Sequence, residues 1–95
     1  VGETRNAYES EDGRKYVGEW SCSEGAWRVS YSEWEYCRIL EGKVRLSGDD
    51  GTIIEAGPGG NITIEPGFSG VWENLSPVRK IYVIDVGAGE GGGSA

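Results

Sequence analysis

Hydrophobic and polar residues alternate along most of this chain with the period of two that β-strands produce. In the clearest case Trp27, Val29 and Tyr31 alternate with Arg28 and Ser30. No stretch keeps the period of an amphipathic helix over the length that a helix needs, and turns rich in Gly, Pro and Asp separate the alternating runs. The predicted strands cover residues 15–22, 26–31, 35–40, 43–46, 52–55, 61–65, 71–73 and 79–86.

The run from residue 33 to residue 46 is central to the predicted fold, because it predicts two consecutive strands that meet at Gly42. On the first strand Glu35, Cys37 and Ile39 share a face, so the Glu35 carboxylate is expected to point inward. The last predicted strand, residues 79–86, is almost continuously apolar, and we expect it to be covered on both faces.

A chain of 95 residues has room for one domain with one core. The sequence predicts a flexible N-terminus over residues 1–7, a single all-β barrel or sandwich over residues 8–86, and a disordered Gly-rich tail or linker over residues 87–95.

Composition narrows the possible partners. The formal net charge is −7, which argues against nucleic acid and anionic membranes, since both favour basic surfaces. No apolar run is long enough to span a membrane, and no secretory signal pattern is visible, so we expect a cytoplasmic protein. Cys22 and Cys37 are expected to be thiols rather than a disulfide. The chain has no His, which removes the commonest metal ligand and acid–base residue.

The chain resembles the cupin superfamily, whose members are small double-stranded β-helix (jelly-roll) barrels of short antiparallel strands. The first cupin motif runs Gly, five residues, His-x-His, three or four residues, Glu, six residues, Gly, and the second runs Gly, five residues, Pro-x-Gly, two residues, His, three residues, Asn. With four residues between the His-x-His element and the Glu, the first motif falls on Cys22, Arg28, Ser30, Glu35 and Gly42. The second falls on Gly59, Glu65, Gly67, Gly70 and Asn74.

A narrower resemblance is to the small single-domain cupins related to ureidoglycine aminohydrolase and to an ethanolamine-utilisation protein. Seven clusters in order carry it: GEW at 18–20, GAW at 25–27, EYC at 35–37, ILEG at 39–42, EPGF at 65–68, GVWE at 70–73 and PVRKIYV at 77–83.

The metal-binding residues of the superfamily are missing here. The resemblance implies three imidazoles and a carboxylate, which suit a first-row divalent ion. This alignment gives Arg28, Ser30 and Gly70 in place of the imidazoles, and neither arginine nor glycine offers a side-chain ligand. We therefore expect no metal and no cofactor.

The remaining candidates belong to a metal-free ligand pocket, and they are Glu35, Arg28, Ser30, Cys37, Trp72 and Tyr82. A buried Glu35 needs a partner, and Arg28 is expected to supply it, either in a pocket or as a structural salt bridge. Cys37 near Arg28 would be reactive but is otherwise an inert buried thiol. Trp72 is expected at the barrel mouth, where it stacks on a flat ligand or packs in the core. Tyr82 shares a face with Lys80 and is a donor or acid if that face points inward. Asn74 is expected to hold a loop.

Three functions remain open. The first is a metal-free cupin that binds a small polar metabolite, or a stable barrel without catalysis. The second is an enzyme acting on a small amine, ureide or sugar-like metabolite, which the missing His disfavours. The third is a structural module that forms a homodimer through edge strands or the outer face of Tyr36, Leu40 or Ile81, or an engineered scaffold.

Overall fold

The computed structural model describes residues 2–87, and this range folds into nine strands without a helix. None of its elements is therefore a helix able to cross a membrane. The strands are β1 (Gly2–Glu9), β2 (Lys15–Cys22), β3 (Gly25–Ser30), β4 (Trp34–Glu41), β5 (Val44–Gly48), β6 (Ile53–Ala56), β7 (Asn61–Ile64), β8 (Ser69–Asn74) and β9 (Val78–Asp85). The prediction of an all-β fold is confirmed, and each predicted strand has its counterpart from β2 to β9.

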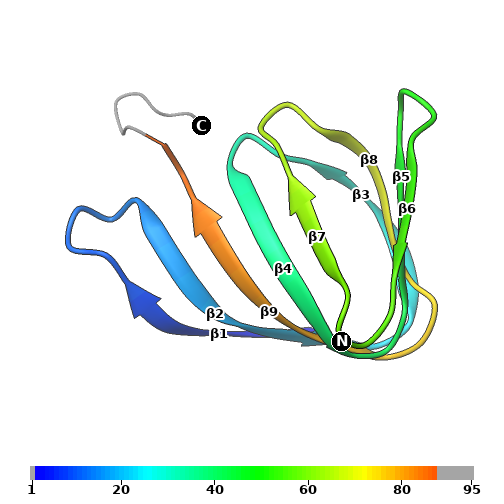
Figure 1. Cartoon of the computed structure of the whole chain (residues 1–95), viewed down its shortest axis with the longest axis horizontal. Coiled ribbons are helices and arrows are strands. Elements are labelled where there is room, and N and C mark those ends of the chain that lie inside the picture. The colour runs from blue at the N-terminus through cyan, green and yellow to red at the C-terminus, as the bar shows by residue number, and fades with distance from the viewer. Residues whose placement is uncertain (1, 88–95) are drawn as a thin grey trace.

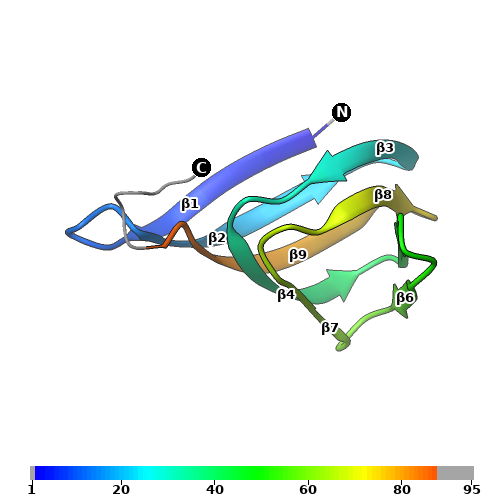
Figure 2. The same ribbon diagram turned by 90° about the horizontal axis from the view of Figure 1, so that it is seen from above.

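The strands form two antiparallel sheets that curl into a cup. The larger sheet has the order β1-β2-β9-β4-β7, and the smaller has the order β3-β8-β5-β6. Figure 1 shows β1, β2 and β9 extending to one side, with β5 and β6 at the other. Seen from above in Figure 2, the chain passes from β3 in the smaller sheet to β4 in the larger one. This exchange between facing sheets is consistent with a jelly roll.

The core lies between the two sheets and is built from the inward positions that the alternation predicts. Cys37 and Ile39 of β4 are fully buried, because the pleat turns alternate side chains toward the opposite sheet. The other buried hydrophobic residues are Val44, Leu46, Ala56, Ile62, Ile64, Trp72, Val78 and Tyr82.

Strand β1 is the element that the sequence pattern misses. Residues 1–7 are predicted to be flexible, yet Gly2–Glu9 pairs along its length with β2, with a bulge between Asn6 and Tyr8. All eight side chains are exposed, so β1 shows no apolar alternation, and its ordering comes from backbone pairing. Of the predicted tail, residues 88–95 lie outside the described range.

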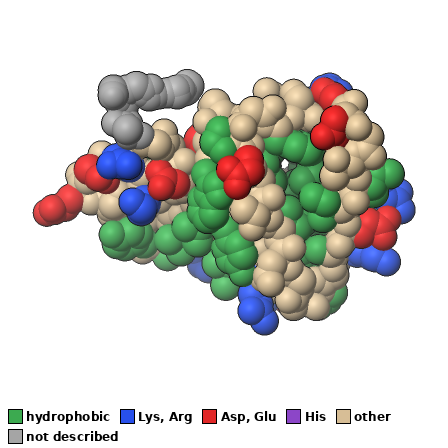
Figure 3. All heavy atoms as spheres, turned by 45° about the horizontal axis from the view of Figure 1, so that its top comes forward, with side chains coloured by type: hydrophobic (Ala, Val, Ile, Leu, Met, Phe, Trp, Pro, Cys, Tyr) green, Lys and Arg blue, Asp and Glu red, His purple; other side chains and the backbone are tan. Residues whose placement is uncertain are grey.

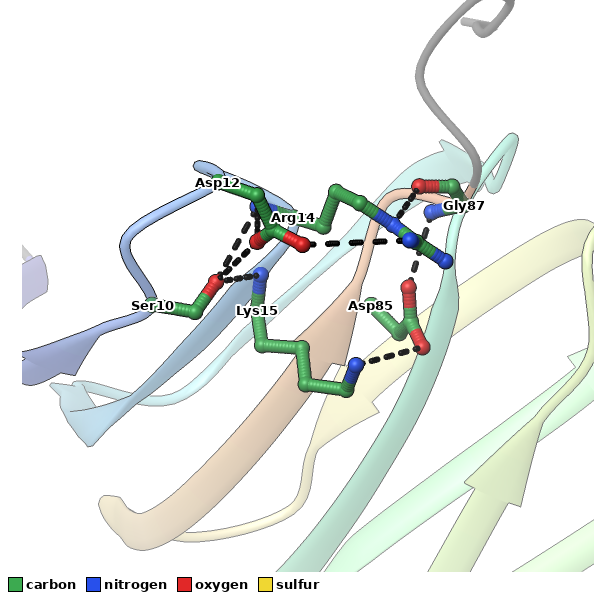
Figure 4. A network of polar contacts seen from close by, with 6 residues as sticks. All are labelled: Ser10, Asp12, Arg14, Lys15, Asp85 and Gly87. Carbon is green, nitrogen blue, oxygen red and sulfur yellow. Dashed lines mark hydrogen bonds and ion pairs between the residues drawn. The ribbon is translucent and has the colours of Figure 1, made fainter.

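A polar network fastens the β1–β2 turn to the end of β9 (Figure 4). The Ser10 hydroxyl donates to Asp12, and the backbone N–H of Arg14 donates to Asp12 as well. These bonds hold the pKa of Asp12 below its usual value. The Arg14 Nε donates to the carbonyl oxygen of Gly87 at 2.5 Å. The network fixes β1 and β2 beside β9, where they form one wall of the cup.

The outer face of β9 departs from the prediction of cover on both faces. Ile81 is 38% exposed, and its neighbours Arg79 and Val83 are only partly buried. No second layer covers this face in residues 2–87, so burial within the described chain does not account for the apolar residues on the outer face of β9.

Candidate functional site

A cavity of about 440 Å³ opens between β1, β2, β9 and β4 on one side and β3 and β8 on the other. Its lining is mostly aromatic and aliphatic, with a few polar groups. The lining residues are Thr4, Asn6, Tyr16, Trp20, Trp27, Val29, Tyr31, Glu33, Glu35, Trp72, Lys80, Tyr82, Ile84 and Val86. Figure 3 shows hydrophobic side chains gathered in the middle of the molecule, with charged ones mainly toward its two ends.

The register of the larger sheet decides which side chains meet in this cavity. Asn6, Gly18, Tyr82 and Cys37 lie opposite one another across β1, β2, β9 and β4. A Cβ at Gly18 would lie 2.7 Å from Cζ of Tyr82, so the missing side chain lets the Tyr82 ring lie across the strand. The Tyr82 hydroxyl can therefore donate a hydrogen bond to Oδ1 of Asn6. Burial, together with the nearby Glu35 carboxylate, raises the pKa of Tyr82.

The floor of the cavity holds a buried ion pair. Nζ of Lys80 lies 2.9 Å from Oε2 of Glu35, and the two side chains are only 8% and 7% exposed. The same ammonium lies 4.2 Å from the ring centroid of Trp72 and 4.8 Å from that of Trp20. Two indole faces and one carboxylate thus surround the charge, which compensates for its loss of water.

Trp72 is itself held in place by a buried hydrogen bond. Its Nε1 donates to Oδ1 of Asn74 at 2.8 Å, and the Asn74 amide donates to the carbonyl oxygen of Ser23 at 3.0 Å. Asn74 therefore anchors the β2–β3 connection, as predicted. Trp72 belongs to the core, and one face of its ring is turned to the floor of the cavity.

The wall that leads to the floor comes from one continuous run of sequence. Trp27, Val29, Tyr31, Glu33 and Glu35 occupy alternate positions, and all five line the cavity as the chain passes from β3 to β4. Burial raises the pKa of Tyr31, and the neighbouring Glu35 carboxylate raises it further. Tyr31 therefore stays a neutral hydroxyl at any physiological pH.

The structure brings together three of the six predicted pocket residues. Glu35, Trp72 and Tyr82 line the cavity. Cys37 is fully buried and does not line it, and burial raises the pKa of the thiol to about 11. This places Cys37 behind the floor as an unreactive thiol.

Arg28 and Ser30 lie outside the cavity, which corrects the predicted partner of Glu35. Both side chains are exposed, and Arg28 forms a surface ion pair with Asp49 at 2.5 Å. Glu35 is instead paired with Lys80. Successive side chains of a strand point to opposite faces, so Arg28 must point outward because its neighbour Val29 points into the cavity.

Lys80, Trp20, Asn6 and Tyr16 also line the cavity, although the sequence predicts no ligand role for them. Lys80 is the most important of them, and its signal is visible in the sequence: it lies two residues before Tyr82, so both share a face. Asn6 leaves no such signal, since it belongs to the exposed strand β1.

The cavity does not offer the ligands of a cupin metal site. With three rather than four residues before Glu35, the two motif histidines fall on inward Val29 and Tyr31. Valine and tyrosine offer no imidazole, and the carboxylate of the motif, Glu35, is already paired with Lys80. Within residues 2–87, no three His, Cys, Asp or Glu side chains are grouped to hold a metal ion.

Comparisons with known proteins agree with the all-β fold. A family model described as the EutQ-like cupin domain matches residues 9–82. The EutQ protein of Clostridium difficile superposes with a TM-score of 0.79 at 22% identity over 90% of this chain and 62% of its own. The putative ethanolamine utilization protein Q of Salmonella typhimurium LT2 has a TM-score of 0.79 at 20% identity, over 90% and 69%.

A DUF861 family protein of Thermotoga maritima matches at 26% identity with a TM-score of 0.66, over 84% of this chain and 97% of its own. No curated protein sequence matches. The chain spans less than two thirds of the C. difficile EutQ chain.

Proposed function

The chain belongs to the EutQ-like cupin domain family, and on that premise we propose that it binds a small organic molecule inside its cup without a transition-metal ion. The observation that carries this proposal is the Lys80–Glu35 pair on the floor of the cavity. A buried ion pair contributes little net stability compared with apolar residues of similar volume. Its position beneath an open aromatic cavity therefore supports a role in ligand recognition.

The size and chemistry of the cavity support the same function. A volume of about 440 Å³ lies within the range of small-molecule sites, which are mostly apolar with a few polar groups that fix orientation. Here the apolar part comes from aromatic rings, on which a flat or apolar ligand can stack. The polar part is the floor pair together with the hydroxyl of Tyr82 and the side chain of Asn6.

Binding is better supported than catalysis, because the thiol and the two phenols with raised pKa values near the cavity are held in their neutral forms. Burial raises the pKa of Cys37 to about 11, and burial also raises those of Tyr31 and Tyr82. None of the three groups is therefore available as an anionic nucleophile or base at neutral pH. An enzyme acting on a small amine, ureide or sugar-like metabolite is the alternative.

A thermal-shift screen of small metabolites tests the binding proposal, because a ligand of the folded state raises the melting temperature. We expect at least one compound to stabilise the protein and Trp27→Ala to remove that shift, since Trp27 lines the cavity and is 37% exposed. The matched control is Ile53→Ala, an exposed apolar residue of β6 outside the lining, which should keep the shift. No stabilising compound, or equal shifts in both variants, would refute the proposal.

The outer face of the larger sheet favours a second function, association with another copy of this chain. Tyr8, Val17, Val83 and Tyr36 lie opposite one another across β1, β2, β9 and β4 and form an outer apolar row. Exposed Ile81 lies two positions from Val83 on β9. Burial of this row against a second copy would account for the apolar outer residues of β9.

The charges around the outer apolar row suit a symmetric contact. Lys15 and Asp85 lie on one side of it, and Arg5 and Arg79 bind Glu19 on the other. Because each side carries both signs, two copies related by a two-fold axis can place opposite charges together. Pairing through edge strand β1 is less favourable, since Glu3, Arg5 and a bulge protect that edge.

Light scattering tests this second proposal. The wild type should have the mass of a dimer and Ile81→Lys that of a monomer, while Ile53→Lys, which changes an exposed residue of the smaller sheet, should remain dimeric. A monomeric wild type would exclude the dimer, and dissociation of both variants would exclude this face.

A further inference from the structure

The charges that line the cavity sum to a negative value. Glu33, Glu35 and Lys80 are its only acidic or basic lining residues within residues 2–87. Lys80 and Glu35 neutralise each other at 2.9 Å, so the remaining formal charge is that of Glu33. The Glu33 carboxylate also acts within the cavity, since its charge contributes to the raised pKa of Tyr31.

Lys80 shows how this cavity treats an alkylammonium group. Its ammonium lies over the rings of Trp20 and Trp72 and donates a hydrogen bond to the Glu35 carboxylate, its only hydrogen-bond partner in the described chain. Ring faces carry negative potential, and aromatic cages with a carboxylate are a recurring way to hold organic cations. One carboxylate and two ring faces already surround this ammonium, so an anionic ligand would have to compete with Glu35 for it.

Aromatic rings and a carboxylate also belong to the rest of the lining. The Trp27 ring lies 6.2 Å from that of Trp20 and is 37% exposed, and Tyr31 and Glu33 follow it at alternate positions of the same wall. These rings and this carboxylate have no basic residue of the lining beside them other than the neutralised Lys80.

We propose that the ligand of this cavity is a small organic cation, a quaternary or alkyl ammonium compound that contacts the aromatic rings of the lining and is attracted by the carboxylate of Glu33. The inference rests on the proposed function, because it names the class of molecule that the same cavity binds. It also sets the preference among ligands of equal shape: a cation binds more tightly than its neutral isostere, and an anion binds least.

Three probes of nearly the same shape test this preference by titration calorimetry. Choline carries the positive charge, 3,3-dimethylbutan-1-ol replaces its nitrogen by carbon, and 3,3-dimethylbutanoate is an anion. We expect choline to bind about tenfold more tightly than the neutral alcohol, because both probes make the same apolar contacts but only the cation is attracted electrostatically by the ring faces and the carboxylate. Glu33→Gln should remove most of this difference. Glu11→Gln, which changes an exposed carboxylate of the β1–β2 turn, should leave it unchanged.

Equal or tighter binding of the alcohol or the carboxylate would overturn the inference and leave the proposed function intact. Absence of binding by all three probes would also overturn it, and the metabolite screen then decides separately whether the cavity binds another class of molecule. Equal losses in Glu33→Gln and Glu11→Gln would show that the preference reflects the net charge of the protein, and would overturn the assignment to this cavity.

Discussion

The ammonium of Lys80 and the carboxylate of Glu35 lie 2.9 Å apart, although 45 positions separate the two residues in the sequence. Lys80 stands opposite Ile39 on β4, so Glu35 is four residues further along the neighbouring strand. Four residues of a strand cover about 13 Å, so the lysine and the glutamate side chains must both reach along the sheet to meet, close to Cys37. The pair therefore depends on antiparallel pairing of β9 with β4 and on no local feature of either strand.

Removing one partner of this pair should strongly destabilise the protein. Lys80→Met leaves Glu35 as an uncompensated buried charge, and we expect the free energy of unfolding to fall by about 3 to 5 kcal/mol. The double variant Lys80→Met with Glu35→Gln should recover much of that loss, because no unpaired charge remains. Urea denaturation of the single and double variants measures the coupling.

Arg28→Met is the control for this experiment, since Arg28 is the partner that the sequence suggests for Glu35. Its ion pair with Asp49 is exposed, and exposed pairs contribute little. Its unfolding free energy should stay close to that of the wild type. A loss in Arg28→Met equal to that in Lys80→Met would contradict the assignment of the pair.

Gly18 should be intolerant of even the smallest side chain. Gly18→Ala places a Cβ against the backbone carbonyl oxygen of Arg5 and 2.7 Å from Cζ of Tyr82, so strand β1 and the ring must both move and the hydrogen bond from Tyr82 to Asn6 is lost. We expect a loss of about 1 to 3 kcal/mol in unfolding free energy, the usual effect of overpacking. Gly57→Ala is the matched control, because nothing lies near its added Cβ. If both variants are equally stable, the Tyr82 ring does not lie across Gly18.

The strands of this fold can be predicted from the sequence because each leaves a local alternating signal. Strand β1 leaves none, since its residues are exposed and its partners are the backbone of β2 and a few polar side chains. The site depends on non-local information. Choosing Lys80 over Arg28 as the partner of Glu35 requires knowing that β9 neighbours β4 and that β3 turns Val29 inward. The alternation over residues 27–31 already places Trp27, Val29 and Tyr31 on one face. It therefore favours the alignment with three residues before Glu35, which puts the motif histidines on Val29 and Tyr31.

Restoring imidazoles at inward positions should create a metal site, which tests this spacing. We expect the triple variant Val29→His, Tyr31→His, Lys80→Gln to bind Co²⁺ or Zn²⁺ through two imidazoles and the released Glu35 carboxylate. The absorption spectrum of bound Co²⁺ reports the coordination. The matched control is Arg28→His, Ser30→His, Lys80→Gln, whose new side chains face outward and should not form the site. Binding by the control alone would restore the four-residue alignment.

The buried thiol of Cys37 should make stability fall in alkaline solution. Burial raises its pKa from 9.0 to about 11, so between these values the unfolded chain loses a proton that the folded chain keeps. The contribution of the protonated Cys37 thiol to the free energy of unfolding is therefore fully present below pH 9 and declines as the pH rises toward 11, by at most about 3 kcal/mol. Urea denaturation at pH 8, 9 and 10 should show a decline that is smaller in Cys37→Ala than in the wild type. The raised pKa values of Tyr31 and Tyr82 act in the same direction at higher pH and remain in the variant. Cys22→Ala, which changes a partly exposed thiol, should reproduce the wild-type profile, and an equal decline in the wild type and Cys37→Ala would assign the alkaline loss to the tyrosines.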